Sequence, residues 1–308
     1  MHSLVRMLLK EVHDREPRAI ARAISIVENG KDKADAILSG LDSTRIEQAT
    51  IIGITGPPGA GKSTLTSRLI AHYRSRNERI GIIAIDPTSP ISGGAILGDR
   101  IRMMDHALDP DVVIRSMATR GRLGGLCAAA AGAARIMAAS GCTTIIIETV
   151  GVGQSEMDII RVADITALIL APGLGDDIQA MKAGLLEVVD VLVVNKSDCH
   201  GADALAMDLQ AAIRDGGGKK FTPKVLMTSA SENRGIIELA DTIYRIDASH
   251  RQTGERKIRR KLSFEIEVLD WALEIIKPKL KQIIEQTSPS MLTGDPMRRA
   301  REVLKKFT

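Results

Sequence analysis

Aromatic side chains are scarce in this sequence, whose 308 residues include one Trp, two Tyr and three Phe. Such a set offers almost nothing on which nucleic-acid bases could stack, so we expect no nucleic-acid partner. The core must instead be built from Ile, Leu, Val, Ala and Met. No apolar run approaches the ~18 residues that a membrane-spanning helix needs, so we expect no membrane partner either.

Cysteine and histidine are also few, with three and six residues. Cys127, Cys142 and Cys199 lack metal-ligand spacing and cannot all pair, which indicates free thiols in a reducing compartment. The first residues, MHSLVRMLLKEVHDREPR, carry early acids and too short an apolar core for a signal peptide. We therefore expect a cytoplasmic protein.

The net charge is only +4, but it is unevenly distributed. From Arg251 to the end, Lys and Arg outnumber Asp and Glu by 14 to 8, so the rest of the chain is slightly acidic. A basic tail can contact nucleic acid or an acidic partner. A solvated helical face is the simpler explanation.

The chain divides by its pattern into three segments. Residues 1–47 have the apolar spacing of helices. Residues 48–250 alternate short apolar runs with helical stretches, and residues 251–308 are helical again. We therefore expect an α/β domain with N-terminal helices on one side and a C-terminal helical arm on the other.

The central segment contains seven short apolar runs, which we expect to be strands. The runs are continuous rather than alternating, which is typical of parallel strands covered on both faces. The prediction is a mostly parallel, doubly wound α/β sheet, in which ligands bind beyond the carboxyl ends of the strands. The expected strands occupy residues 50–55, 79–86, 111–116, 143–148, 165–171, 189–195 and 224–230.

Proline and glycine mark the ends of several expected helices. Pro17 suits a first helical turn, and Gly30 suits a C-terminal stop. In the arm, an apolar stripe runs from Leu262 to Ile284, and Pro278 should kink or end this helix. Asp295 should cap a final helix.

A phosphate-binding loop follows the first expected strand. GPPGAGKST has the spacing G-x-x-x-x-G-K-[ST] between a strand and a helix. In this pattern backbone N–H groups wrap the phosphates, Lys62 reaches the β and γ oxygens, and the Ser63 hydroxyl binds Mg²⁺. A P-loop nucleotide-binding protein is therefore predicted. The residues assigned to nucleotide binding here are Gly56, Pro57, Pro58, Gly59, Ala60, Gly61, Lys62, Ser63 and Thr64.

Polar residues behind two later strands indicate which base is bound. VLVVNKSD places Asn195, Lys196 and Asp198 directly after a buried strand. Asp198 can accept the pair of N–H groups that guanine presents and adenine lacks. Lys196 can lie on the purine face, and Asn195 can brace the loops. After the next strand, Ser229 and the backbone N–H of Ala230 can meet the guanine carbonyl, so the nucleotide is predicted to be GTP or GDP.

An acid at the end of an apolar strand predicts a metal ion. The run IIIETVGVGQSE stops at Glu148, and burying a carboxylate without a partner costs several kcal/mol. Nucleotide-bound Mg²⁺ would supply the opposite charge, with Ser63, Asp86 and Asp99 as further oxygen donors. Because Mg²⁺ keeps several waters, not all of these groups need touch it. Asp99 lies in a glycine-rich loop and can equally be solvated.

Further polar residues lie in loops that can reach the transferring phosphate. Gly151 permits a mobile segment whose N–H contacts the γ-phosphate. Gln154 and Lys182 can reach that phosphate or its water, although a plain surface loop explains the Lys182 segment as well. Arg102 and Arg120 can stabilise charge or simply form surface salt bridges.

Several motifs together carry a family resemblance. GPPGAGKST, AIDPTSPISGGAILGDRIRM, ETVGVGQSE, GDDIQAMKAGL and VVNKSD resemble the ArgK/MeaB family, G-protein chaperones of adenosylcobalamin-dependent acyl-CoA mutases such as methylmalonyl-CoA mutase. The resemblance covers close to the whole chain. It implies a Mg²⁺-dependent GTPase with a SIMIBI-type G domain. Such a protein gates cofactor loading of a mutase, protects the mutase and helps to reactivate it.

The resemblance also implies roles for individual residues. Glu148 would be linked to Mg²⁺ and followed by a switch, while Asp99 and Arg102 would lie in a second motif near the nucleotide. Lys182 would lie in a third switch that faces the mutase, and the arm would form a homodimer contact. This chain has DDIQAMKAG where many relatives have a DDLQGIKKG-like string, which leaves the choice of mutase open.

Other functions fit a P-loop with this base motif. Nickel-delivery GTPases usually have His- or Cys-rich ligand sets, which this sequence lacks. A small-molecule kinase needs a hydroxyl- or guanidino-binding pocket that no motif reveals, and an RNA- or membrane-targeting GTPase would use the basic C-terminus. Without a water-positioning Gln in the usual place, we expect intrinsic turnover on the order of 10⁻⁴ to 10⁻² s⁻¹ and stimulation by a partner.

Overall fold

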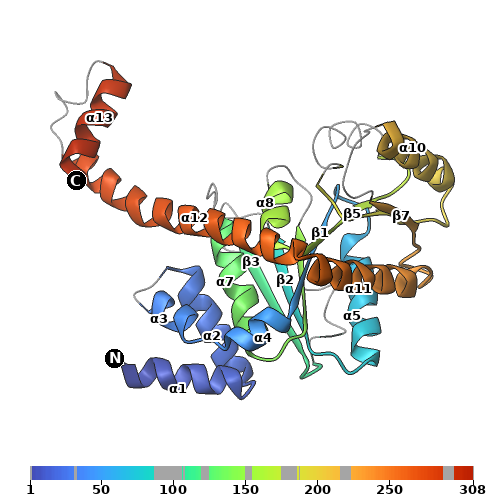
Figure 1. Ribbon diagram of the computed structural model, residues 1–308, viewed down its shortest axis with the longest axis horizontal. Coiled ribbons are helices and arrows are strands. Elements are labelled where there is room, and N and C mark those ends of the chain that lie inside the picture. Colours follow the sequence, from blue (N-terminus) through green and yellow to red (C-terminus); the bar gives the residue numbers. More distant parts are fainter. Residues whose placement is uncertain are drawn as a thin grey trace.

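A seven-stranded parallel sheet forms the centre of the molecule (Figure 1). In this computed structural model the strand order is β3-β2-β4-β1-β5-β6-β7. The strands are β1 (Thr50–Thr55), β2 (Ile80–Asp86), β3 (Val112–Ala118), β4 (Thr144–Thr149), β5 (Ile165–Leu170), β6 (Val191–Val194) and β7 (Lys224–Met227). The predicted sheet is thus confirmed, with small differences at the strand ends. The structure describes residues 2–30, 33–86, 106, 108–118, 125–149, 155–174, 186, 188–215, 223–286 and 295–307.

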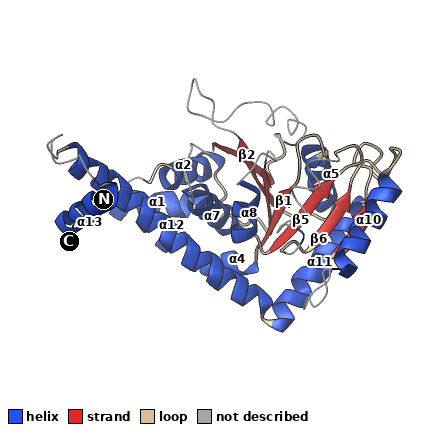
Figure 2. Ribbon diagram, turned by 90° about the horizontal axis from the view of Figure 1, so that it is seen from above, coloured by secondary structure: helices blue, strands red, loops and turns tan. Residues whose placement is uncertain are grey.

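Helices cover both faces of the sheet (Figures 1 and 2). On one face, Leu65 of α5 and Leu239 of α11 pack with alternate strand residues such as Ile54. On the other face, α7 and α8 cover β2, β3 and β4, and α10 covers β5 and β6. Because inner strands such as β4, β5 and β6 are buried on both sides, their residues are mostly apolar without alternation. These helices are α5 (Lys62–Ser75), α7 (Gly125–Ala139), α8 (Ser155–Val162), α10 (Ala202–Asp215) and α11 (Ile236–Thr253).

Four N-terminal helices form an outer layer over α7. Close approach occurs at Gly132 of α7, where a Cβ atom would lie 2.7 Å from Val27 of α2. Gly30, just beyond the end of α2, has a φ of 57°, so the predicted helix stop is confirmed. The helices are α1 (His2–His13), α2 (Pro17–Glu28), α3 (Ala34–Ser39) and α4 (Ser43–Gln48).

The C-terminal arm consists of α12 (Glu255–Glu285) and α13 (Pro296–Phe307) and extends away from the sheet (Figure 1). The expectation that Pro278 could end its helix is wrong, because α12 continues through it. Pro278 is exposed, so water can bond the carbonyl that its missing N–H leaves free. Asp295 accepts from the Met297 N–H at 3.0 Å, so the predicted cap is confirmed. None of the helices in the described ranges is long and apolar enough to cross a membrane.

Paired arginines fasten the arm to the sheet. Arg260 donates from Nε and Nη2 to the Asp164 carboxylate at 2.7 and 2.8 Å. Arg259 donates in the same two-pronged way to Asp190, at 2.8 and 2.9 Å. Asp164 and Asp190 directly precede β5 and β6 and are almost fully buried. The arm is therefore anchored at the amino ends of the strands, on the rim opposite the phosphate loop.

Candidate functional site

The phosphate loop joins β1 to α5 and is packed closely against its neighbours. Gly56 and Gly61 have φ values of 141° and 87°, which favour glycine. A Cβ atom on Gly56 would lie 2.0 Å from the Ile169 carbonyl oxygen, and one on Gly61 would lie 2.4 Å from Asn195 Nδ2. These two glycines therefore let the loop lie directly on β5 and on the Asn195 side chain.

Lys62 and Ser63 occupy the first turn of α5, and both are buried. The Lys62 Nζ donates to the carbonyl oxygens of Gly56 at 2.8 Å and Pro57 at 3.0 Å. These bonds hold the ammonium group against the loop, beside the N-terminus of a helix. The helix dipole and the ammonium charge both favour a phosphate at this position.

The Ser63 hydroxyl donates a hydrogen bond to Glu148 Oε1 at 2.6 Å. Glu148 lies on β4, which runs between β1 and β2, and it is paired in register with Ile54 and Ala84. The glutamate is only 3% exposed. The acid that ends this apolar strand is therefore a partner of the helix that carries the phosphate loop.

Ser63 and Glu148 offer the hard oxygen donors that Mg²⁺ prefers. Asp86 ends β2, and this places its backbone at the same rim of the sheet. Its side chain lies outside the described residues. Within the described ranges, no group of three or more His, Cys, Asp and Glu side chains is placed so that it could hold a metal ion by itself. The described part of the predicted metal site is thus the Ser63–Glu148 pair, and this pair fits the ion.

Asn195 connects the phosphate loop to the loop that follows β7. Its Nδ2 donates to the Ala60 carbonyl at 2.9 Å. Its Oδ1 accepts from Thr228 Oγ1 and from the Ala230 N–H, each at 3.1 Å. The side chain is 2% exposed, so these bonds are sheltered from water. Because the Ala230 N–H already has an acceptor here, its contact with a guanine carbonyl stays a prediction.

The remaining base-motif residues lie on the surface just beyond β6. Lys196 is exposed and has a φ of 56°. Asp198 is also exposed, and a hydrogen bond from the Ser229 hydroxyl is the main cause that lowers the pKa of its carboxyl group. A lowered pKa keeps the carboxylate ionised at neutral pH, so it remains an acceptor for N–H groups.

One residue of this region was not predicted. Arg68, on α5, donates from Nε to the Ala230 carbonyl at 3.0 Å. The residue lies on the helix behind the phosphate loop, outside any motif. An exposed arginine at a helical position usually indicates only a solvated face, so no local pattern distinguished it.

Several predicted site residues fall where the structure describes nothing. Asp99, Arg102, Arg120, Gly151, Gln154 and Lys182 lie outside the described residues. Their roles therefore remain predictions from the sequence.

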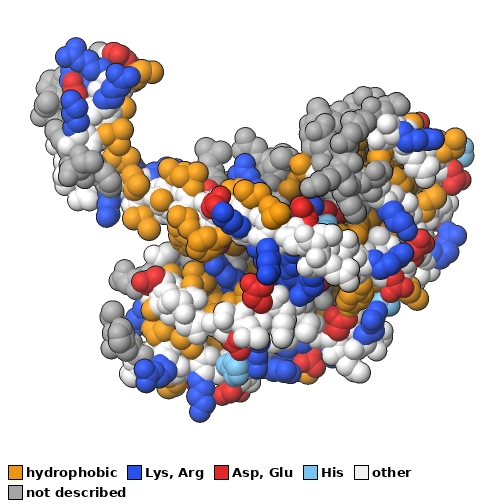
Figure 3. Space-filling view, viewed as in Figure 1, with side chains coloured by type: hydrophobic (Ala, Val, Ile, Leu, Met, Phe, Trp, Pro, Cys, Tyr) orange, Lys and Arg blue, Asp and Glu red, His pale blue; other side chains and the backbone are white. Residues whose placement is uncertain are grey.

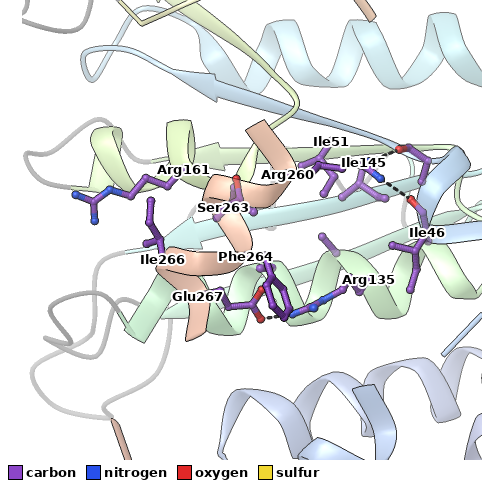
Figure 4. Close-up of a pocket in the computed structure, with 15 residues that line it drawn as sticks. Ile46, Ile51, Arg135, Ile145, Arg161, Arg260, Ser263, Phe264, Ile266 and Glu267 are labelled. Carbon is purple, nitrogen blue, oxygen red and sulfur yellow. Dashed lines mark hydrogen bonds and ion pairs between the residues drawn. The ribbon is translucent and has the colours of Figure 1, made fainter. Parts of the chain in front are cut away.

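A separate cavity of about 130 Å³ lies at the base of the arm (Figure 4). Its wall is mostly apolar and comes from α4, α7, α8, α12 and the starts of β1 and β4. The ion pair between Arg135 and Glu267 crosses one side, and burial raises the pKa of Glu267. The cavity contains none of the predicted site residues, so it is distinct from the nucleotide site.

Comparison with known proteins identifies the family. The model of the family described as methylmalonyl Co-A mutase-associated GTPase MeaB matches residues 20–286. The chain belongs to the MeaB family. The resemblance predicted from the motifs is thereby confirmed.

Relatives of this MeaB-family chain include archaeal and bacterial proteins. A Pyrococcus abyssi protein with GTPase in its name is 45% identical over 287 residues, which cover 92% of this chain and 88% of the relative. The GTPase ArgK of Escherichia coli strain K12 is 33% identical over 271 residues, which cover 83% of this chain and 80% of ArgK. A solved LAO/AO transport system kinase covers 100% of this chain and 98% of its own, with a TM-score of 0.71 and 22% identity. This last likeness shows the fold alone.

Proposed function

We propose that this chain binds GTP and GDP with Mg²⁺ and hydrolyses GTP to GDP and phosphate. The observation that carries the proposal is the position of Asn195. It bonds Ala60 of the phosphate loop and Ala230 of the predicted base loop with one side chain. Two motifs far apart in the sequence thus belong to a single site.

The proposed roles follow the chemistry of each group. The loop from Gly56 to Gly61, with Lys62 and Thr64, binds the phosphates. Ser63 and Glu148, with Asp86 and Asp99, hold the metal ion or its waters. Asn195, Lys196, Asp198, Ser229 and Ala230 form the base site, while Arg102, Gly151, Gln154 and Lys182 act around the γ-phosphate.

Bound Mg²⁺ would supply positive charge for the β and γ oxygens. The Ser63–Glu148 bond prepares a ligand for that ion. Because the Ser63 hydroxyl donates its hydrogen bond to Glu148, the lone pairs of the serine oxygen are left to face a cation. Glu148 thereby orients the serine, and Lys62 adds a second positive charge beside the phosphates. None of Lys62, Ser63 and Glu148 is placed to position the attacking water, so slow intrinsic GTP turnover is expected.

We further propose that the partner is an adenosylcobalamin-dependent acyl-CoA mutase. The description of the matching family, which associates its GTPases with methylmalonyl-CoA mutase, supports this partner. The GTPase would gate cofactor loading, protect the mutase and help to reactivate it. Cys142 and Cys199 are free thiols, which supports a cytoplasmic setting.

The arm supports a proposed homodimer. Figure 3 shows hydrophobic side chains along α12, where it leaves the body of the protein. So many large apolar groups in contact with water favour an interface, and most soluble oligomers are symmetric dimers. The exposed large apolar residues of α12 are Ile258, Leu262, Phe264, Val268, Leu269, Leu273, Ile275 and Ile284.

An exchange of base specificity tests the nucleotide assignment. Asp198→Asn replaces an acceptor with a donor, so preference should move from guanine toward xanthine nucleotides. Hydrolysis of GTP, ATP and XTP is measured with Mg²⁺ and with EDTA. Unchanged GTP selectivity would remove Asp198 from the base site. Equal use of GTP and ATP by the unaltered protein would overturn the guanine assignment itself.

The partner is tested by adding purified candidate mutases to the GTPase assay. Stimulation of GTP hydrolysis by one mutase, and co-elution with it in size-exclusion chromatography, are the expected results. If no acyl-CoA mutase produced either effect, the chaperone proposal would fail while the GTPase proposal stood.

A further inference from the structure

The cavity at the base of the arm exists because α7 presents a row of alanines there (Figure 4). Ala131, Ala134 and Ala138 line it, and their spacing places them on one face of the helix, opposite α12. From α12 the short side chain of Ser263 lines the same space. Small side chains on both helices thus leave the space open. Its volume of about 130 Å³ is close to that of an apolar cavity that holds one benzene ring.

Two hydrogen-bond donors border this cavity without an acceptor among the residues that the structure describes. One is the Nε–H of Arg135, which is buried, although Nη2 of the same guanidinium pairs with Glu267. The other is the hydroxyl of half-buried Ser263, which lies on α12 one turn before Glu267 and therefore on the same side of that helix. A buried donor without an acceptor is costly, so a ligand that supplies an acceptor would be favoured here.

Positive charge predominates around the cavity. The described part of its wall includes Arg135, Arg161 and Arg260 together with one acid, Glu267. Asp164 neutralises Arg260. Arg161 is exposed, and the carboxylate with which it pairs lies 3.6 Å away, beyond hydrogen-bond distance. An anionic group should therefore be attracted to this cavity, and a cation should be repelled.

We propose that the cavity binds a small carboxylate whose apolar body has about six carbons. The hydrocarbon part would lie against the alanines of α7, and the carboxylate would accept hydrogen bonds from Arg135 Nε and from Ser263. Such charge-assisted bonds are stronger than those of a neutral acceptor. Because Arg135 belongs to α7 and Ser263 to α12, the ligand would join the arm to the body of the protein. The cavity is distinct from the nucleotide site, so the inference does not depend on the proposed function.

Trp271 provides the assay. It is the only tryptophan of the chain, and its Nε1 donates to Glu267 at 3.3 Å, next to the ion pair of Glu267 with Arg135. Benzoate, benzyl alcohol and benzylamine share the ring and differ in charge. Each is titrated into the full chain and followed by tryptophan fluorescence and by calorimetry.

Benzoate should give a saturable change in Trp271 fluorescence, with a dissociation constant of about 1 mM for a ligand of its size. Benzyl alcohol should bind about tenfold more weakly because its hydroxyl is an uncharged acceptor. Benzylamine should show no measurable binding, because its charge has the same sign as that of the arginines.

Three variants locate the binding. Ala131→Leu should fill the cavity and abolish benzoate binding. Ser263→Ala should weaken benzoate about fivefold, the value of one hydrogen bond, and it serves alone if the leucine variant does not fold. Arg135→Met combined with Glu267→Gln removes the guanidinium without leaving a buried carboxylate unpaired, and benzoate should then bind no tighter than benzyl alcohol. Ala212→Leu is the matched control, because Ala212 is also half-buried but lies on α10, outside the cavity wall, and benzoate affinity should be unchanged.

Several results would overturn the inference. Benzyl alcohol that binds the unaltered protein as tightly as benzoate would make the cavity a purely apolar site, and the absence of any saturable response to benzoate would leave no carboxylate site at all. Equal benzoate affinity in Ala131→Leu and Ala212→Leu would place the ligand elsewhere. Benzoate binding that converts dimers into monomers in light scattering would assign the cavity to a second copy of the chain instead.

Discussion

Removal of the Asn195 side chain should weaken both the fold and nucleotide binding. Asn195→Ala deletes three hydrogen bonds, to Ala60, Thr228 and Ala230. All three partners are buried, with exposures of 3% or less. Their polar groups would be left unpaired unless water entered the small space vacated by the amide.

The size of the effect follows from the number of bonds. At about 1 kcal/mol of net stability for each buried hydrogen bond, the loss is about 3 kcal/mol. These bonds join the phosphate loop to the loop after β7 without any nucleotide bound. Their loss should therefore lower the free energy of unfolding of the nucleotide-free protein. Binding of GDP must then order the loops again, which should raise its dissociation constant between about 10-fold and 100-fold.

A matched variant separates this reasoning from general damage. Thr228→Val keeps the side-chain shape but removes only the bond from Thr228 Oγ1 to Asn195, so about 1 kcal/mol should be lost. Urea unfolding and calorimetric titration with GDP measure both quantities for the two variants. If Asn195→Ala cost no more than Thr228→Val in unfolding and left GDP affinity intact, Asn195 would not join the two loops.

Glu148→Ala should lower the rate of Mg²⁺-dependent GTP hydrolysis more than it lowers the affinity for GDP. Both quantities are measured on the same variant, and an unchanged hydrolysis rate would contradict the metal role of Glu148. Replacement of the exposed Leu262 and Leu269 by Glu should yield monomers in light scattering without lowering the unfolding midpoint, and a persistent dimer would place the interface elsewhere. Burial raises the pKa of Asp270, and none of the described residues donates a hydrogen bond to its Oδ2. A raised folded pKa means that stability is greatest when the group is protonated and falls as pH rises above its ordinary value near ~4. Asp270→Asn should therefore be more stable than the unaltered protein at pH 7 and similar at pH 3, and thermal melts with no such difference would contradict this account.

Much of the fold could be predicted because its signals are local. Each of the seven strands begins in or contains a short apolar run of the sequence, and the structure confirms every one. The phosphate loop lies between β1 and α5 because glycine, lysine and serine occur there at the required spacing. Helix ends at Gly30 and Asp295 also follow from local rules. For Pro278 the local rule allowed either a kink or an end of the helix, and only the end is wrong, because α12 continues through this residue.

The base loop shows where local reasoning stopped. Asn195 was expected to brace the loops, but its acceptance of the Ala230 N–H could not be foreseen. Arg68 was missed altogether, because a single arginine on a helix has no motif around it. The same holds for Arg259 and Arg260, whose carboxylate partners precede two separate strands. Their charge suggested only a basic tail.

The sequence by itself determined which segments form strands and helices, and which residue types follow each strand. Those properties depend on steric preference and apolar spacing over a few neighbouring positions. The tertiary structure alone decided which groups meet. Ser63 and Glu148 lie 85 positions apart, and Arg68 and Ala230 lie 162 apart. A buried polar group requires a partner, but many partners would satisfy it chemically, and the order of the strands selects one.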